Sequence, residues 1–386
     1  MDLTLNNAVM GVELSGIRQF TYLVRDTPGA CALTIGEPDL NTPDVIKEAA
    51  KAALDANDTH YPPGNGYPYA LEAISKFEAE AHGLHYAPSE VILTVGATEA
   101  LFASFSTILN PGDEVIIPTP AFGLYEALVQ LQGGVPVSLP TEHNHFQIVP
   151  EELKAAITDR TKAIILTSPN NPTGVIYSDE TLKNIASVLE KKEKELGISI
   201  VLISDEPYRE LAYDGAVVPW VTNYYCNTVV CYSYSKSLSL PGERIGYLVI
   251  PDEAADAEDI QAAANVATRI LGYVNAPSLM QRAVARCLDA QADVPYYDRN
   301  REALYTGLKK LGFSCIKPEG AFYLFVKSPV EDERVFCQAA KKHHILIVPG
   351  SSFACPGYVR IAYCVSYETI VNSMDGFKKL AEEFQL

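Results

Sequence analysis

Seven short runs of aliphatic and β-branched residues, separated by segments of helical periodicity, constrain the fold of this chain more than any other feature. The runs are apolar at consecutive positions, as strands buried on both faces should be. They cover residues 91–95, 114–118, 135–139, 162–168, 199–204, 228–234 and 244–250. Helical patterns lie between them, for example at 98–109 and 179–196. This alternation predicts an α/β fold with a mostly parallel, seven-stranded, doubly wound sheet and helices on both faces.

The pattern changes after about residue 253, where long helical segments replace the alternation. Short strands are expected again at 322–327, 344–350 and 358–364, with helices around them. This part of the chain is interpreted as a smaller α+β domain. The predicted organisation is an N-terminal segment that packs with the small domain, a large domain and a small C-terminal domain, at residues 1–45, 46–294 and 295–386.

Composition excludes several classes of function. The net charge of −18 argues against a nucleic-acid or anionic-membrane partner, because both need a basic face. The first residues lack the features of a secretory signal, and no apolar run approaches the ~20 residues of a membrane span. Eight cysteines without a C-x-x-C pair, and histidines at no recognisable ligand spacing, indicate reduced thiols and no metal site. A cytoplasmic protein is expected.

Polar side chains follow four of the predicted strands. Ligands bind at the carboxyl ends of strands in open parallel sheets, because the loops and helix N-termini converge there. One crevice would collect an anion cradle at a helix start, an amide, a carboxylate, a phenol and a lysine. The residues concerned are Ala97 and Thr98, Asn171, Asp205, Tyr208 and Lys236.

The lysine lies in SYSKSLSLPGERIGYL, residues 233–248, between hydroxyl side chains and with Arg244 eight positions further on. Basic residues are scarce, with 30 lysines and arginines against 48 acids, so this turn suggests a bound anion. No glycine-rich loop precedes Lys236 at the G-x-x-x-x-G-K spacing, which excludes a nucleotide P-loop. A covalent anchor lysine would need the desolvated pocket, phosphate cradle and balancing acid that these strand ends supply together.

From Ile35 to Tyr363 the chain resembles the class I pyridoxal-phosphate aminotransferases of fold type I. Four motifs carry the resemblance in family order: SPNNPTG (168–174), SDEPY (204–208), SYSKSLSLPGERIGY (233–247) and YVRIAY (358–363). The resemblance also implies cis peptide bonds at Asn171-Pro172 and Thr119-Pro120, which only X–Pro bonds adopt at modest cost.

The resemblance implies a pyridoxal 5′-phosphate cofactor in Schiff-base linkage to Lys236, which afterwards moves the substrate's α proton. Asp205 would pair with the pyridinium nitrogen and keep it protonated. Asn171 and Tyr208 would hydrogen-bond the 3′ oxygen of the ring. Phe122 would lie against the cofactor face, where it stacks without donating a hydrogen bond.

The phosphate group would be held by Ser233, Ser235 and Arg244, together with the backbone N–H groups of Ala97 and Thr98. The fixed fork of donors on arginine suits this role. By the same resemblance, Tyr61 reaches the phosphate of the neighbouring subunit, which implies a homodimer with shared active sites.

For the substrate, the resemblance assigns the α-carboxylate to Arg360 through two parallel hydrogen bonds, with Gly36 and Asn171 beside it. The leading hypothesis is a ping-pong aminotransferase that acts on L-amino acids and 2-oxo acids. An α,β-eliminating lyase or an aminocyclopropane-carboxylate synthase-like enzyme would use the same residues and stays an alternative. A non-catalytic binding protein is a further one.

Substrate choice is open at this level. A dicarboxylate substrate needs a second cation, for which Arg18, Arg25 and Arg269 are candidates. An aromatic or aliphatic substrate needs an apolar pocket, which the 35 tyrosines and phenylalanines of the chain could supply. Our hypothesis is a broad-range enzyme that takes neutral or aromatic amino acids with 2-oxoglutarate.

Overall fold

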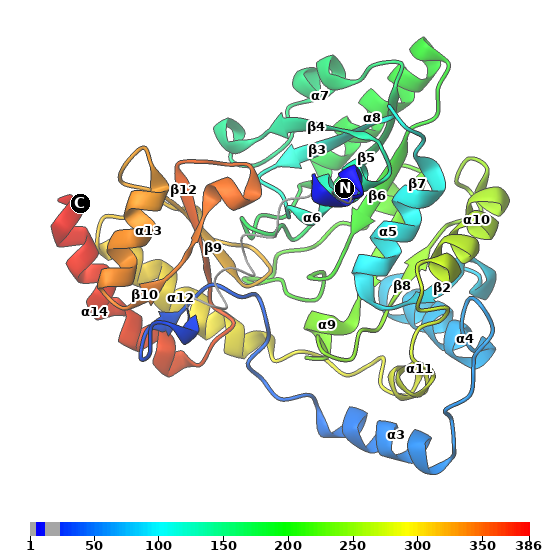
Figure 1. Cartoon of the computed structure of the whole chain (residues 1–386), viewed down its shortest axis with the longest axis horizontal. Coiled ribbons are helices and arrows are strands. Elements are labelled where there is room, and N and C mark those ends of the chain that lie inside the picture. Colours follow the sequence, from blue (N-terminus) through cyan, green and yellow to red (C-terminus); the bar gives the residue numbers. More distant parts are fainter. Residues whose placement is uncertain (1–4, 12–23) are drawn as a thin grey trace, which may run out of the picture.

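The structure is a computed structural model that describes residues 5–11 and 24–386. Figure 1 shows a large unit around a central sheet and a smaller unit that carries the C-terminal helices at one end of the molecule. Among the described residues, no helix combines the length and apolar character needed to cross a membrane.

The central sheet has seven strands in the order β2-β8-β7-β6-β5-β3-β4. All neighbours are parallel except that β8 runs antiparallel to both β2 and β7. Each strand overlaps one of the seven predicted runs, so the α/β prediction is confirmed. The strands are β2 (Val91–Thr94), β3 (Glu114–Thr119), β4 (Val135–Pro140), β5 (Thr161–Thr167), β6 (Val201–Asp205), β7 (Thr228–Ser233) and β8 (Gly246–Val249).

The direction of β8 agrees with the absence of a full helix in its connection to β7. Parallel neighbours are usually joined by a crossover that contains a full helix. Between β7 and β8 the chain makes only the single turn α9 (Tyr234–Ser237) and a loop. The strand returns beside β7 in the opposite direction, and Lys236 lies in this tight reversal at the end of the sheet.

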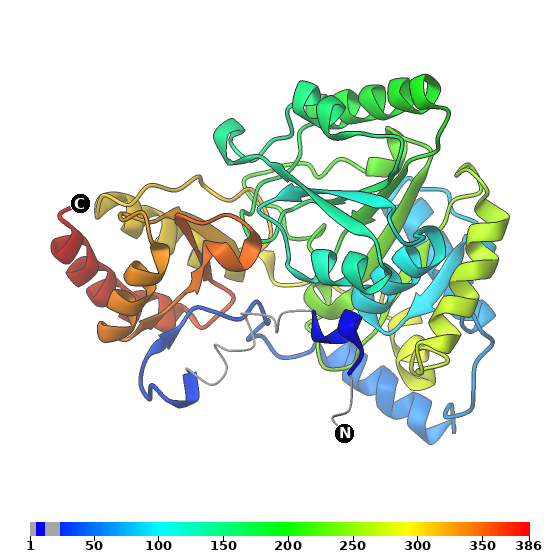
Figure 2. The same ribbon diagram turned by 45° about the horizontal axis from the view of Figure 1, so that its top comes forward.

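Helices cover both faces of the sheet because successive strand residues point to opposite sides. Val115 and Ile117 face one core, whereas Ile116 between them faces another. In Figure 2, α8 lies on the side of the sheet opposite α5 and α6. The helices of this unit are α3 (Asp44–Asp55), α4 (Pro68–Phe77), α5 (Gly96–Ile108), α6 (Leu124–Leu131), α7 (Pro150–Ala156), α8 (Asp179–Leu196), α10 (Ala257–Ile270) and α11 (Ser278–Ala285).

Local signals fix some helix ends. The helix predicted at 179–196 is α8 with the same limits. Ser178 caps it by accepting a hydrogen bond from the Thr181 backbone N–H, and Gly197 ends it in the left-handed conformation. The shorter elements are α1 (Asn7–Met10), the π-helix η1 (Glu78–His82) and the 3-10 helices η2 (Pro88–Glu90), η3 (Glu142–Asn144), η4 (Val221–Asn223) and η5 (Gly350–Phe353).

The smaller unit has an antiparallel sheet in the order β11-β12-β9 and a parallel pair, β1 with β10. One strand was predicted over 344–350; that prediction was wrong, because the chain changes partners at Ile347. Before this residue it pairs with β1, and after it with β12. The elements are β1 (Cys31–Ala32), β9 (Tyr323–Lys327), β10 (Ile345–Leu346), β11 (Val348–Pro349), β12 (Tyr358–Ala362), α12 (Val294–Lys310), α13 (Glu333–Lys342) and α14 (Tyr367–Phe384). The domain limits at residues 45 and 294 stay predictions.

Candidate active site

The peptide bonds before Pro120 and Pro172 are cis, as predicted, and so is the bond before Pro169. Pro169 and Pro172 lie in the loop that follows β5 and carries Asn171. Strands β2, β5, β6 and β7 run in the same direction, so this loop and the ends of β2, β6 and β7 lie at the same edge of the sheet. The candidate side chains predicted at that edge are therefore brought into one region.

Arg244 joins two of the strand ends. Its guanidinium group donates from Nη1 to Ser235 Oγ at 3.3 Å and from Nη2 to the Val95 carbonyl at 3.5 Å. The hydroxyls of Ser233 and Ser235 are 2.8 Å apart. A Cβ at Gly96, where φ is +75°, would lie 2.6 Å from Arg244 Nη2, so only glycine lets the arginine come this close.

Ala97 and Thr98 lie in the first turn of α5, directly after Gly96. The first backbone N–H groups of a helix have no partner within the helix, and the helix dipole is positive there. With Arg244 and the two serine hydroxyls, these groups form a concentration of hydrogen-bond donors. Such a site suits a phosphate group.

Lys236 extends from α9 toward the N-terminal segment. Its Nζ atom donates to the Gly36 carbonyl oxygen at 2.5 Å. Loss of hydration is the main cause that lowers the pKa of this ammonium group to about 8, with Arg244 and Arg360 acting in the same direction. A lysine with this pKa is partly neutral near neutral pH, which a nucleophile or base requires.

Asp205 ends β6 and is buried. Its Oδ2 accepts a hydrogen bond from the Tyr125 hydroxyl at 2.6 Å, whereas Oδ1 is buried without a partner. Burial raises the pKa of this carboxyl to about 7, and the bond from Tyr125 opposes that rise. One oxygen is thus fixed by the protein while the other is available to a donor such as a protonated ring nitrogen.

Asp205→Asn should stabilise the cofactor-free protein above pH 7. With its pKa raised to about 7 from 3.8, the folded chain keeps between about pH 4 and 7 a proton that the unfolded chain has lost. Stability therefore falls as pH rises through that window, by on the order of 2–4 kcal/mol. The stability of the asparagine variant should not fall in this way between pH 4 and 7, because asparagine does not titrate. Thermal unfolding from pH 4 to 8 measures the difference.

The matched control is Asp179→Asn, because Asp179 is exposed and its pKa is lowered, first of all by its hydrogen bond from Lys183. That variant should keep the pH profile of the wild type. Parallel profiles for Asp205→Asn and the wild type would contradict the prediction.

Arg360 is buried at 1% exposure in the middle of β12. Nη1 donates to Asn171 Oδ1 at 3.0 Å, Nη2 donates to the Thr34 carbonyl, and Nε has no partner. The guanidinium carbon lies 4.4 Å from the ring centre of Tyr323 and 4.7 Å from that of Phe353. A desolvated guanidinium group held in a fixed plane is suited to bind a carboxylate.

Tyr208 lies three residues after Asp205 and is buried. Its hydroxyl is 2.8 Å from the hydroxyl of Tyr323. Burial is the main cause that raises its pKa well above the usual value, so the phenol stays protonated and can donate. Phe122 is partly buried and packs edge-to-face on Tyr125, with ring centres 5.8 Å apart.

Three successive backbone carbonyls of the N-terminal segment cover these side chains. Thr34 O accepts from Arg360, Ile35 O from the Cys364 thiol at 3.5 Å, and Gly36 O from Lys236. The segment is held in place by β1 and by the hydrogen bond from the Ala362 N–H to Leu33 O. Residues 34–36 therefore lie directly on the donors of the site.

Some predicted residues are not brought together with the others. Tyr61 stands apart, with 89% of its surface exposed. Of the candidate second cations, Arg269 is exposed in the last turn of α10, and Arg25 is hydrogen-bonded to the neighbouring Asp26. Arg18 lies outside the described residues.

Sequence reasoning missed Tyr125, Tyr323 and Phe353. Tyr125 could have been found, because it lies only three residues after Phe122, across the turn that begins α6. Tyr323 and Phe353 belong to apolar runs that look like ordinary core, and no sequence signal separates them from it.

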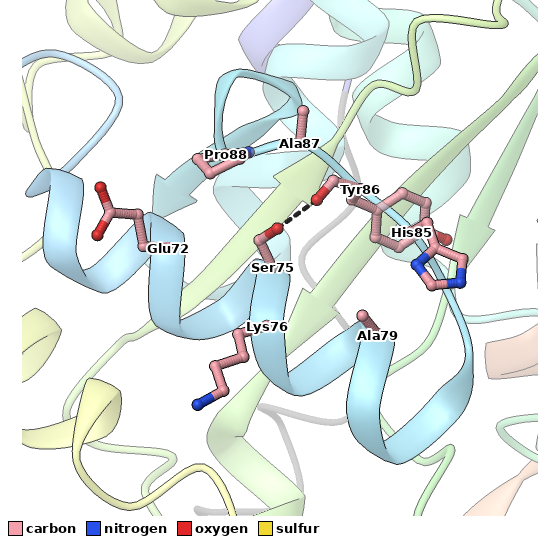
Figure 3. Close-up of a pocket in the computed structure, with 8 residues that line it drawn as sticks. All are labelled: Glu72, Ser75, Lys76, Ala79, His85, Tyr86, Ala87 and Pro88. Carbon is pink, nitrogen blue, oxygen red and sulfur yellow. Dashed lines mark hydrogen bonds between the residues drawn. The ribbon is translucent and has the colours of Figure 1, made fainter.

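Two surface hollows lie away from these residues. Figure 3 shows the smaller one, about 380 Å³, between α4, η1 and the segment before β2. Its side chains include Glu72, Lys76 and His85, and Ser75 Oγ donates to the Tyr86 carbonyl. The larger one, about 680 Å³, is lined by residues around Ser178 and Trp220. The site predicted from the strand ends contributes no residue to either.

Comparison with known proteins gives one consistent result. The family model for aminotransferase class I and II matches residues 30–376. A probable N-acetyl-LL-diaminopimelate aminotransferase of Bacillus subtilis is 36% identical, covering 97% of this chain and 95% of the relative. An aspartate aminotransferase of Geobacillus stearothermophilus is 37% identical, covering 91% of both chains.

Solved structures agree with the sequence relatives. An amino transferase from Eubacterium rectale superposes with a TM-score of 0.95 at 40% identity, with all of both chains covered. The aspartate aminotransferase of Thermus thermophilus, crystallised with maleate, gives 0.90 at 33% identity over 98% of this chain and all of that one.

Proposed function

Since this chain belongs to the class I and II aminotransferases, we propose that it binds pyridoxal 5′-phosphate at the edge of the sheet described above and uses Lys236 as its anchor. Aminotransferases of this family work by a ping-pong mechanism, in which an amino acid leaves its amino group before a 2-oxo acid collects it. The observation that carries the proposal is Lys236, an amine that donates to the Gly36 carbonyl and whose pKa is lowered by burial and by the nearby Arg244 and Arg360.

The donor set fits the cofactor's phosphate group. Ser233, Ser235 and Arg244 would bind it with the N–H groups of Ala97 and Thr98. The close approach of Arg244 to Gly96 supports this assignment, since it leaves the arginine and the helix N-terminus on one side. We further propose that Tyr61 of the partner subunit completes the phosphate site.

The ring would be held from several sides. Asp205 Oδ1, which is buried without a partner, would accept from the protonated ring nitrogen. Asn171 and Tyr208 would bond the 3′ oxygen, and Phe122 would pack on one ring face. When bound, pyridoxal phosphate accepts the amino group and delocalises the electron pair left by the α proton.

The residues of the chain then have separate tasks. Arg360, with Gly36 and Asn171 nearby, would bind the α-carboxylate and so orient the α hydrogen toward Lys236. With a pKa lowered to about 8, Nζ of Lys236 can take up that proton and return it during the reaction. The apolar rings around the site limit access of water to this proton.

An absorption spectrum tests the proposal. The purified protein, reconstituted with pyridoxal phosphate, is titrated with single L-amino acids in the absence of any 2-oxo acid. Loss of the yellow band in favour of the shorter-wavelength pyridoxamine form supports transamination and ranks the substrates. A persistent yellow band with pyruvate and ammonia release would instead identify an eliminating lyase, and the lack of any cofactor band would overturn the assignment of Lys236.

For the substrate we propose neutral or aromatic amino acids with 2-oxoglutarate. The support is the ring-rich surrounding of Arg360, formed by Tyr323 and Phe353, with Phe122 packed on Tyr125. In the spectral titration, phenylalanine and leucine should convert the band at lower concentration than aspartate. The reverse order would contradict this choice.

We propose a homodimer whose interface includes Tyr61 and the end of α10. Val266, Ile270 and Tyr273 are 57%, 72% and 63% exposed, which leaves apolar area uncovered in one chain. Asn275 donates to the carbonyls of Pro63 and Gly64, so the loop after Tyr61 lies on this same surface.

Sedimentation should give about twice the chain mass of 42.1 kDa. The double variant Val266→Arg and Ile270→Arg should be monomeric with little activity, because a charge cannot be buried in an apolar interface without a partner. Val217→Arg, at another strongly exposed position, is the control and should stay dimeric. A monomeric wild type with full activity would refute the shared site.

We also propose a cytoplasmic location. All eight cysteines are free thiols, and four of them are buried. This usage fits a reducing compartment. Fractionation of the source cells with an antibody against the chain would test it.

A further inference from the structure

Tyr323 touches three parts of the site at once. It lies in β9 at 2% exposure, in a strand that sequence reasoning treated as core. Its hydroxyl meets the hydroxyl of Tyr208, and its ring lies over the guanidinium group of Arg360. A Cβ at position 36 would be only 1.8 Å from its hydroxyl oxygen, so Gly36 packs directly on that atom.

The two hydroxyls have only one proton each to donate. Burial raises the pKa of Tyr323 to about 12 and that of Tyr208 well above its usual value, so both phenols are protonated at neutral pH. If Tyr208 gives its proton to the 3′ oxygen, its own oxygen becomes the acceptor for Tyr323. A donor at that oxygen polarises Tyr208 and strengthens the bond that Tyr208 gives.

The ring of Tyr323 acts on a different group. Aromatic faces attract a guanidinium group, and Arg360 has such a face at 4.4 Å from Tyr323 and another at 4.7 Å from Phe353. The hydrogen bonds to Asn171 and Thr34 fix the two terminal nitrogens. The rings therefore complete the orientation of the guanidinium plane on which bidentate carboxylate binding depends.

Building on the function proposed above, we propose that Tyr323 is a positioning residue that couples the substrate-carboxylate group, Arg360, to the cofactor-binding phenol, Tyr208. Its hydroxyl donates to the Tyr208 oxygen, and its ring helps to orient the guanidinium group of Arg360. The two contributions can be separated, because Phe353 supports Arg360 by a ring alone.

Two single variants test this separation. Tyr323→Phe keeps the ring and removes the hydroxyl, whereas Phe353→Leu removes one ring from Arg360 and leaves both hydroxyls. The control is Tyr225→Phe, which loses a buried hydroxyl bonded to the Ile200 carbonyl in another core. Thermal unfolding of all three shows whether each variant is folded.

The first readout is the pH titration of the absorbance of bound pyridoxal phosphate. Weaker donation to the negatively charged 3′ oxygen makes the deprotonated linkage to Lys236 less favourable, so the midpoint should rise. For Tyr323→Phe we expect an increase of roughly 0.2–0.6 pH units. Phe353→Leu and Tyr225→Phe should titrate like the wild type.

The second readout is the Kd of 3-phenylpropionate, a carboxylate without an amino group. Phe353→Leu should raise this Kd about three- to tenfold, because it removes one ring contact of the guanidinium group. Tyr323→Phe should stay within about twofold of the wild type. This opposite pattern in two variants is not expected from a general loss of stability.

A wild-type titration midpoint in folded Tyr323→Phe would overturn the coupling to Tyr208. An unchanged Kd in Phe353→Leu would overturn the contribution of the Phe353 ring to Arg360, and an unchanged Kd in folded Tyr323→Leu would overturn that of the Tyr323 ring. These failures differ from failure of the proposed function, in which the wild type itself would show no cofactor band and no spectral response to amino acids.

Discussion

Lys236→Ala should abolish transamination while leaving the fold intact, with a loss of activity on the order of 10⁴-fold. The amine is the proposed anchor of the cofactor and carrier of the α proton, and no second lysine is paired with the site residues in the described part of the chain. Its contacts include one hydrogen bond to the Gly36 carbonyl and a position over the Phe322 ring, both of them weak, so the melting temperature should change little. Steady-state rates and thermal unfolding check the two halves of this prediction.

Lys183→Ala is the matched control, since Lys183 is an exposed lysine on α8 paired with Asp179. It should retain the activity of the wild type. Near-normal turnover in Lys236→Ala would remove Lys236 from the mechanism and return its lowered pKa to a simple effect of burial.

The second large effect is expected for Arg360→Ala. This change removes the proposed contact with the α-carboxylate, which every amino acid substrate shares. We expect kcat/KM to fall by roughly 30- to 1,000-fold for all of them, mainly through KM. Kinetics with phenylalanine, leucine, alanine and aspartate would measure whether the loss is uniform.

Arg360→Lys provides the comparison within the same position. It keeps the positive charge but loses the planar fork, so it should recover only part of the loss. A defect confined to aspartate would instead assign Arg360 to side-chain recognition.

The central sheet could be predicted because buried parallel strands leave a strong trace in the sequence. Its carboxyl edge then located Asn171, Asp205 and Lys236, since topology brings strand ends together regardless of their distance along the chain. The change of pairing strand at Ile347, from β1 to β12, could not be predicted, because an apolar run does not indicate which strand it pairs with.

The same limit applies to side chains around the site. Tyr323 serves Tyr208 and Arg360 from positions 115 and 37 residues away, and its apolar neighbours in β9 conceal it. Tyr61 shows the opposite case, because only the resemblance gave it a role and a single chain leaves it exposed. The periodicity of apolar residues predicts neither the contacts between distant segments of the chain nor the contacts between subunits.

The carbonyls of residues 34 and 36 occupy the donors of Arg360 and Lys236. In the proposed role of Arg360, a substrate carboxylate that takes the Nη2 donor displaces the Thr34 oxygen, so the chain would carry a competitor for its own substrate. The measured free energy of substrate binding will then be the difference between the free energies of the carboxylate contact and of the carbonyl contact that it replaces. A substitution that weakens the contact of residues 34–36 can therefore tighten substrate binding without touching the substrate.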